Sequence, residues 1–163
     1  MATAVMPSSA VNANNSNAHN HTMKELPDEA IDAIVRRDIR EGQSFTLHVT
    51  GNSMTPDLSL GDKIVVSPGR CFPGDVIAFL THEPGKRKIH RYLGPLWTPD
   101  GWKKLAKGDN NPAPDVLIKP ADLVGKVMTL NGEKFRPGAG VRWRAVAAYL
   151  NWSIRILAGK LLP

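Results

Sequence analysis

Short apolar runs separated by glycine and proline turns dominate residues 45–128 of the chain. Turn residues recur there about every eight to twelve residues, which is the spacing typical of all-β sandwiches and barrels. A helical bundle would instead need apolar residues at a period of about 3.6 over longer segments. The thirteen prolines and fourteen glycines of the chain also fit many turns and short strands. The sequence therefore predicts a mainly β, barrel-like body.

Several segments are predicted to form the strands of this body. In the first segment, Phe45, Leu47 and Val49 alternate with polar residues, as in a half-buried strand. A Gly-Asp pair, which is a turn signal, precedes two of the later runs. The other predicted strands are residues 63–66, 76–80, 89–93, 116–118 and 124–128, with a turn at 98–101 and a basic hairpin loop at 84–88.

A helix is predicted on the N-terminal side of the β body, at residues 27–42. Pro27 suits a first helical turn, and the two acidic residues that follow it complement the positive end of a helix. Ile31, Ile34 and Val35 lie on one apolar stripe, and Gly42 closes the segment. We expect this helix to pack on the edge of the domain.

A second helix is predicted at residues 141–162, although its polar residues do not gather on one side. An arginine such as Arg155 inside a spanning helix would cost about 2.5–3.5 kcal/mol. One expectation is therefore a helix on a membrane surface or on a partner, with Trp143, Tyr149 and Trp152 at the contact. The other is a purely structural helix.

The length of 163 residues allows one domain with tails. We expect a disordered polar tail at residues 1–24, a domain at 25–135 with its core at about 44–130, and the C-terminal helix at 136–163. No signal peptide and no long apolar run is visible, so we expect a cytoplasmic or peripherally membrane-associated protein without an N-terminal anchor. Cys71 is the single cysteine, which excludes an internal disulfide and a Cys-rich metal site, and no cofactor or metal is expected.

Ser53 lies in the stretch Gly-Asn-Ser-Met-Thr-Pro that directly follows the first predicted strand. A serine at the end of a rigid element is well placed for a nucleophile, but its hydroxyl needs a neighbouring base near neutral pH. His90 and the lysines at positions 63, 86 and 88 are the candidate bases, and histidine has the better pKa for this work. Asp109 and Asp115 lie in a polar loop that could fold back to His90 and orient it.

The chain resembles the type I signal peptidases, a group of serine peptidases, over about residues 49–128. Several segments carry the resemblance in the family's order: Gly-Asn-Ser-Met-Thr-Pro at 51–56, Gly-Asp at 61–62, Gly-Asp-Val-Ile-Ala-Phe at 74–79, Ile-His-Arg at 89–91, Lys-Gly-Asp-Asn-Asn at 107–111 and Val-Gly-Lys-Val at 124–127. The histidine before Arg91 is similar to the archaeal and endoplasmic-reticulum subtype, whereas the bacterial subtype has a lysine base there.

The resemblance implies the family's coiled β-sheet barrel and its peptide-bond hydrolysis. It implies Ser53 as nucleophile, His90 as general base, Asp115 in the charge-relay role, and Asp109 as a second acid that is catalytic or organises the loop. Backbone N–H groups near Ser53 would hold the oxyanion. The implied partner is a peptide or preprotein with small residues before the cut. The membrane anchor that family members carry before the serine is not visible in this sequence.

Three alternatives remain beside this reading. A self-cleaving repressor shares the fold but needs a DNA-binding region and a cleavable Ala-Gly bond before the serine, and no Ala-Gly precedes Ser53. A non-catalytic binding module would not need every catalytic position to be filled. A nucleic-acid binder would account for the net charge of +6 but not for the ordered motifs, so no nucleic acid is expected as a partner.

Overall fold

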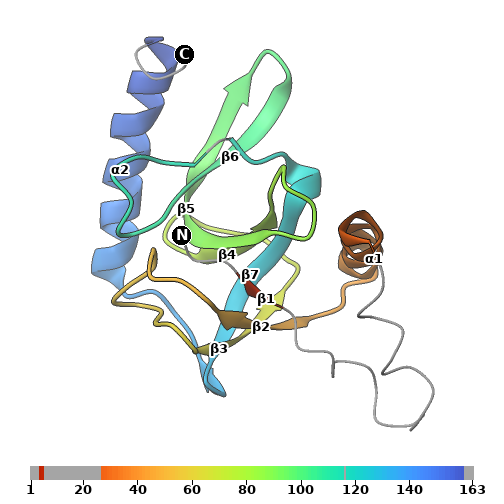
Figure 1. Ribbon diagram of the computed structural model, residues 1–163. Helices are drawn as coiled ribbons and strands as arrows, with labels where there is room; N and C mark the ends of the chain where they lie inside the picture. The colour runs from red at the N-terminus through yellow and green to blue at the C-terminus, as the bar shows by residue number, and fades with distance from the viewer. Residues whose placement is uncertain (1–3, 6–26, 116, 160–163) are drawn as a thin grey trace, which may run out of the picture.

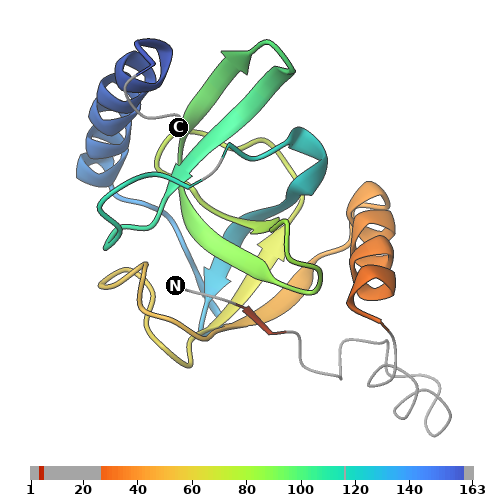
Figure 2. The same ribbon diagram turned by 45° about the horizontal axis from the view of Figure 1, so that its top comes forward.

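The computed structural model describes residues 4–5, 27–115 and 117–159, which form a mainly β body with one helix at each side (Figures 1 and 2). The predicted mainly β class and both predicted helices are confirmed. The helices are α1 (Asp28–Arg40), α2 (Ala139–Leu157) and the short 3-10 helix η1 (Pro120–Asp122). The strands within the described ranges are β1 (Ala4–Val5), β2 (Phe45–Val49), β3 (Lys63–Ser67), β4 (Val76–Leu80), β5 (Arg87–Thr98), β6 (Gly101–Lys107), β7 (Leu123–Leu130) and β8 (Glu133–Lys134).

The strands form one antiparallel sheet in the order β1-β2-β3-β7-β4-β5-β6, with β8 paired to β7. The predicted strands at 45–49, 63–66, 76–80, 89–93 and 124–128 are confirmed, and the turn at 98–101 joins β5 to β6. β5 is longer than the predicted strand at 89–93, and its register with β6 shifts between Tyr92 and Gly94.

One expectation about local structure is corrected. The strand predicted at 116–118 is wrong, since Ile118 makes only an isolated bridge with Lys104, and residue 116 lies outside the described ranges. Pro114 and Pro120 flank this segment, and proline has no N–H with which to extend a ladder. The polar tail expected at residues 1–24 lies outside the described ranges apart from Ala4 and Val5, which form β1.

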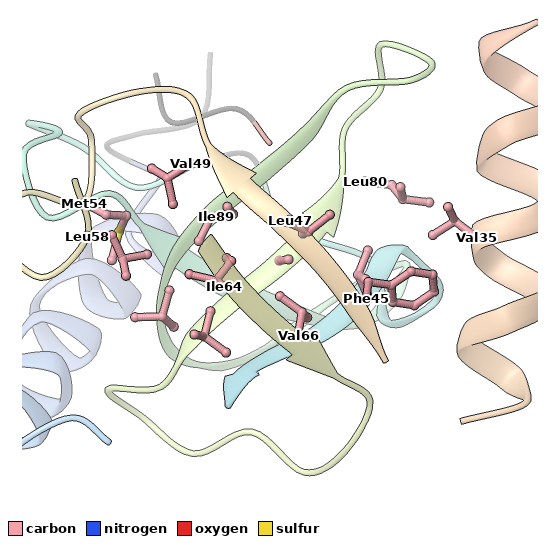
Figure 3. Close-up of a cluster of buried hydrophobic side chains, with 14 residues drawn as sticks. Val35, Phe45, Leu47, Val49, Met54, Leu58, Ile64, Val66, Leu80 and Ile89 are labelled. Atoms are coloured by element: carbon pink, nitrogen blue, oxygen red, sulfur yellow. The ribbon is translucent and has the colours of Figure 1, made fainter. Parts of the chain in front are cut away.

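The main core lies between the strands and takes side chains from β2, β3, β4, β5 and β7, which alternate along β2, β3 and β4 (Figure 3). Met54 and Leu58, from the loop after β2, are fully buried in this cluster. Their side chains therefore hold the loop that carries Ser53 against the core. Burying a side chain of this size is worth about 1.5–3 kcal/mol. Ile77 and Phe79 point to a second cluster on the other face, which explains why all five residues of β4 are buried.

Helix α1 packs on the edge of the β body, as predicted. Val35 is buried in the main core (Figure 3), and acidic residues in the first turn and arginines in the last turn complement the helix dipole. Two ion pairs tie the helix to the β body, Arg36 to Asp122 of η1 at 2.7 Å and Asp32 to Arg87 of β5 at 3.3 Å. The second of these contacts fixes the start of β5, which carries His90.

Helix α2 packs along β5. Its inner face joins a third apolar cluster, in which Tyr149 and Trp152 lie against the protein's own strands. The Tyr149 hydroxyl donates to the carbonyl of Pro95 at 2.6 Å. A Cβ on Gly94 would lie 2.6 Å from the Tyr149 ring, so only glycine allows this close approach. The expectation that Trp143, Tyr149 and Trp152 all face a membrane or partner is therefore wrong for the last two.

Among the described helices, none combines the length and the apolar character needed to cross a bilayer.

Candidate active site

Ser53 lies in the loop between β2 and β3, where the chain leaves the sheet. The buried side chains of Met54 and Leu58 hold this loop against the core, and the Leu58 N–H donates to the Met54 carbonyl at 3.0 Å. Ser53 itself is only 2% exposed. The serine is therefore held on a rigid support rather than on a solvated turn.

His90 lies in β5 and faces Ser53. Its neighbour Ile89 points into the main core, so alternation along the strand turns the imidazole to the other face. The His90 Nε2 lies 2.9 Å from the Ser53 Oγ, and its ring makes an edge contact with Phe79 at a centroid distance of 6.0 Å. Because the imidazole is fully buried, its orientation is fixed by packing as well as by hydrogen bonding.

Asp115 contacts the other nitrogen of the imidazole, since its Oδ2 is hydrogen-bonded to His90 Nδ1. A carboxylate can only accept, so Nδ1 carries the proton and Nε2 is left to accept the proton of the Ser53 hydroxyl. The backbone N–H of Asp115 donates to the Ala106 carbonyl at 2.9 Å, which attaches the acid to β6. The three side chains thus form one hydrogen-bonded series.

Asp109 does not belong to this series in the structure. Both of its carboxylate oxygens accept from Arg91, at 2.8 Å from Nε and 2.6 Å from Nη2. Arg91 also donates to Asp57 at 2.7 Å and to the Gly74 carbonyl at 2.8 Å. The structure therefore brings Asp115, but not Asp109, to the histidine, and it gives Asp109 a role in holding three loops together.

The charge of Arg91 is stabilised although the residue is almost fully buried. Burial works against the charged form, but hydrogen bonds and charge attraction from Asp109 and Asp57 outweigh it and raise the arginine pKa above its ordinary value. No role for Arg91 or Asp57 was predicted from the sequence. An arginine within an apolar strand was a signal that carboxylates must be near, but the sequence did not identify them.

The loop around Asp109 also supports the serine directly. The Asn110 N–H donates to the Ser53 carbonyl at 2.9 Å, and its side-chain amide donates to the Asn52 carbonyl at the same distance. A Cβ on Gly108 would lie 3.0 Å from the Ser53 Cβ and 2.8 Å from the Asn111 amide nitrogen. Glycine at this position thus lets the two loops approach each other.

The lysines considered as alternative bases lie in different surroundings. Lys86 pairs with Glu83 at the surface, and Lys63 is an exposed residue of β3. Lys88 reaches the site, where its Nζ lies 3.3 Å from Asp115 Oδ1. Its position places a positive charge beside the acid rather than a base beside the serine.

Over the described ranges, no group of three or more His, Cys, Asp or Glu side chains is arranged to hold a metal ion.

The strand that precedes Ser53 and the strand that carries His90 each have an edge with little pairing. On the side away from β3, β2 pairs only with the two-residue strand β1. β6 pairs with β5 only from Arg91 onward, so residues 87–90 have one edge that β6 does not cover. β1 pairs with β2 at Val49 and His48 and also contacts β5. β1 therefore lies beside both strands.

Comparisons of the chain with known protein families, with curated proteins and with solved structures find no match.

Proposed function

We propose that this protein is a serine endopeptidase that resembles the type I signal peptidases and works by a Ser-His-Asp mechanism. The observation that carries the proposal is the hydrogen-bonded series from the Ser53 hydroxyl through His90 to Asp115. Serine hydrolases activate a hydroxyl by the same arrangement, in which a base contacts the nucleophile and an acid orients the base. We further propose that the antiparallel sheet corresponds to the coiled β-sheet barrel of that family.

The mechanism follows from the roles of the three side chains. His90 Nε2 takes the proton of Ser53 as Oγ attacks the scissile carbonyl, and the imidazolium formed is stabilised by Asp115. Backbone N–H groups near Ser53 stabilise the oxyanion. His90 then gives the proton to the leaving amine, and an acyl-enzyme remains. A water molecule, deprotonated by the same histidine, hydrolyses this ester and restores the serine.

The substrate we propose is an extended peptide with small residues before the cut. The incompletely paired edges of β2 and of residues 87–90 in β5 support this, because strand edges bind an extended chain through backbone hydrogen bonds. A small side chain suits a nucleophile that is as enclosed as Ser53. A peptide bound there would take the place of β1, which lies beside the same edges.

The experiment is incubation of the purified chain with peptides and precursors that contain Ala-x-Ala segments, with the products identified by mass spectrometry. Ser53→Ala and His90→Ala should each lower the rate by a factor on the order of 10⁴ to 10⁶ while the circular dichroism spectrum stays unchanged. Ser59→Ala, which removes an exposed hydroxyl from the same loop, is the matched control and should keep full activity. Full activity of Ser53→Ala would overturn the proposal.

Two further readouts separate the alternatives. A near-total loss of peptidase activity in Lys88→Ala, with activity retained in His90→Ala, would indicate a lysine base. The mass of the chain itself is recorded in every incubation, because cleavage of the chain without cleavage of any added peptide would favour the self-cleaving alternative.

A further inference from the structure

Helix α2 carries a second apolar stripe that faces away from the protein. Trp143, Leu150, Ile154 and Leu157, which we call the α2 stripe, are 75%, 56%, 67% and 72% exposed. Their spacing of seven, four and three residues places them on one side of a helix that turns by about 100° per residue. Four large apolar side chains in one exposed row differ from the single exposed leucine that any surface tolerates.

The α2 stripe lies opposite the face by which the helix is held. That inner face includes Ala145, Tyr149, Trp152 and Ile156, which pack in the cluster against β5. Figures 1 and 2 show α2 at the outer edge of the molecule, with the strands on one side of it only. The helix is therefore fixed in place while its outer row remains available for contact.

The surroundings of the stripe are positively charged. Residues 134–163 include six lysines and arginines and no aspartate or glutamate, whereas residues 1–133 carry fifteen basic and fifteen acidic side chains. The whole net charge of +6 therefore comes from the segment that contains α2. Such a distribution favours an anionic partner.

Individual cations lie at the stripe and at the beginning of the helix. Arg144 and Arg155 lie along one flank of it, and the Arg155 guanidinium rests 5.2 Å from the centroid of the Trp152 ring. A pocket of about 460 Å³ opens near the N-terminal end of α2, where Lys126, Lys134, Arg136 and Arg142 face a single carboxylate, Asp75. Positive charge thus accompanies the stripe from its start.

We propose that α2 docks the protein on an anionic lipid surface, with the α2 stripe in the interface and the arginines at the headgroups. Tryptophan and arginine beside a row of aliphatic residues are typical of helices that lie in the plane of a membrane interface. A second copy of the chain fits the α2 stripe less well than an anionic lipid surface does. Two such helices in contact would bring their arginines together with no acidic residue on either helix to compensate.

The test is cosedimentation of the full chain with vesicles of phosphatidylcholine alone and of phosphatidylcholine mixed with phosphatidylglycerol. We expect binding to the anionic vesicles that weakens as salt rises, because exposed charges are screened. Arg144→Gln and Arg155→Gln should each weaken binding by about fivefold. The triple variant Trp143→Ser, Ile154→Ser, Leu157→Ser should weaken it by more than about tenfold.

The controls are chosen to match the tested residues in exposure. Leu60→Ser removes a leucine that is 73% exposed but lies outside α2, and Arg70→Gln removes an exposed arginine outside it. Both should bind like the unmodified chain, and thermal unfolding should show that every variant remains folded. Equal binding by the triple variant, or no binding of the unmodified chain to anionic vesicles, would overturn the proposal. A dimer in sedimentation equilibrium that the triple variant abolishes would assign the stripe to a second copy instead. None of these readouts depends on peptidase activity.

Discussion

The guanidinium of Arg91 meets the carboxylate of Asp109 through two hydrogen bonds, of 2.8 and 2.6 Å, and the same guanidinium reaches Asp57 in the serine loop. The residue before Arg91 is His90, whose ring contacts Ser53 and Asp115. Two adjacent residues of β5 therefore have different roles in the site. His90 connects the proposed reacting groups, and Arg91 connects the loops that carry them.

This division predicts different outcomes for the two aspartates. Asp115→Asn should lower kcat by a factor on the order of 10⁴, because an amide in place of the carboxylate favours the wrong tautomer of His90. Asp109→Asn should have a smaller effect on kcat and a larger one on the melting temperature, because it breaks the ion pair with Arg91. Steady-state kinetics and thermal unfolding of both variants test this. Equal losses of kcat with unchanged stability would contradict the assignment.

Replacing Arg91 should destabilise the whole site. Arg91→Met leaves Asp109 and Asp57 without their shared cation and should lower the free energy of unfolding by about 3 kcal/mol. Arg91→Lys should recover only part of this, because an ammonium cannot match the paired hydrogen bonds of a guanidinium. Urea denaturation provides the measurement, with exposed Arg70→Met as the control. A loss of less than about 0.5 kcal/mol in Arg91→Met would show that the network contributes little.

Tyr92 should make stability depend on alkaline pH. Burial, the largest cause, raises the pKa of its phenol to about 12, whereas an unfolded tyrosine has a pKa of about 10. Because the folded state holds the proton more tightly, this contribution is fully present below about pH 10 and is lost as the pH rises toward about 12. Denaturation midpoints measured across this window should fall less steeply in Tyr92→Phe than in the unmodified chain. Identical slopes would rule out this role for Tyr92.

Removing the N-terminal segment should free the strand edge with which β1 pairs. A chain that begins at Met23 lacks Ala4 and Val5, which pair with β2 beside the proposed site. We expect it to cleave the same peptides with a lower KM and an unchanged kcat, since competition for the strand edge is relieved. A synthetic peptide of residues 1–10, added back, should restore the higher KM. An unchanged KM after truncation would show that β1 does not compete with substrate.

Much of the fold was predictable because its signals are local. The alternation in β2, the turns before β3 and β4, and the proline and charged residues at the ends of α1 act between residues that are close in the chain. The prediction failed where contacts from elsewhere decide. The segment at 116–118 is apolar enough for a strand, but the prolines around it leave one bridge to Lys104. No pattern in the sequence predicts that Ala4 and Val5 pair with β2.

The sequence alone determined the residue types of the proposed site and their order, because a serine after a strand, a histidine within one and aspartates in a polar loop can be read directly. It could not decide which aspartate serves His90, since Asp109 and Asp115 share one loop and only its path in space separates them. It also could not decide which face of α2 is buried, because both faces of the helix are apolar. Packing against β5 settled this, since Gly94 leaves room for the ring of Tyr149 and so turns Trp143 outward.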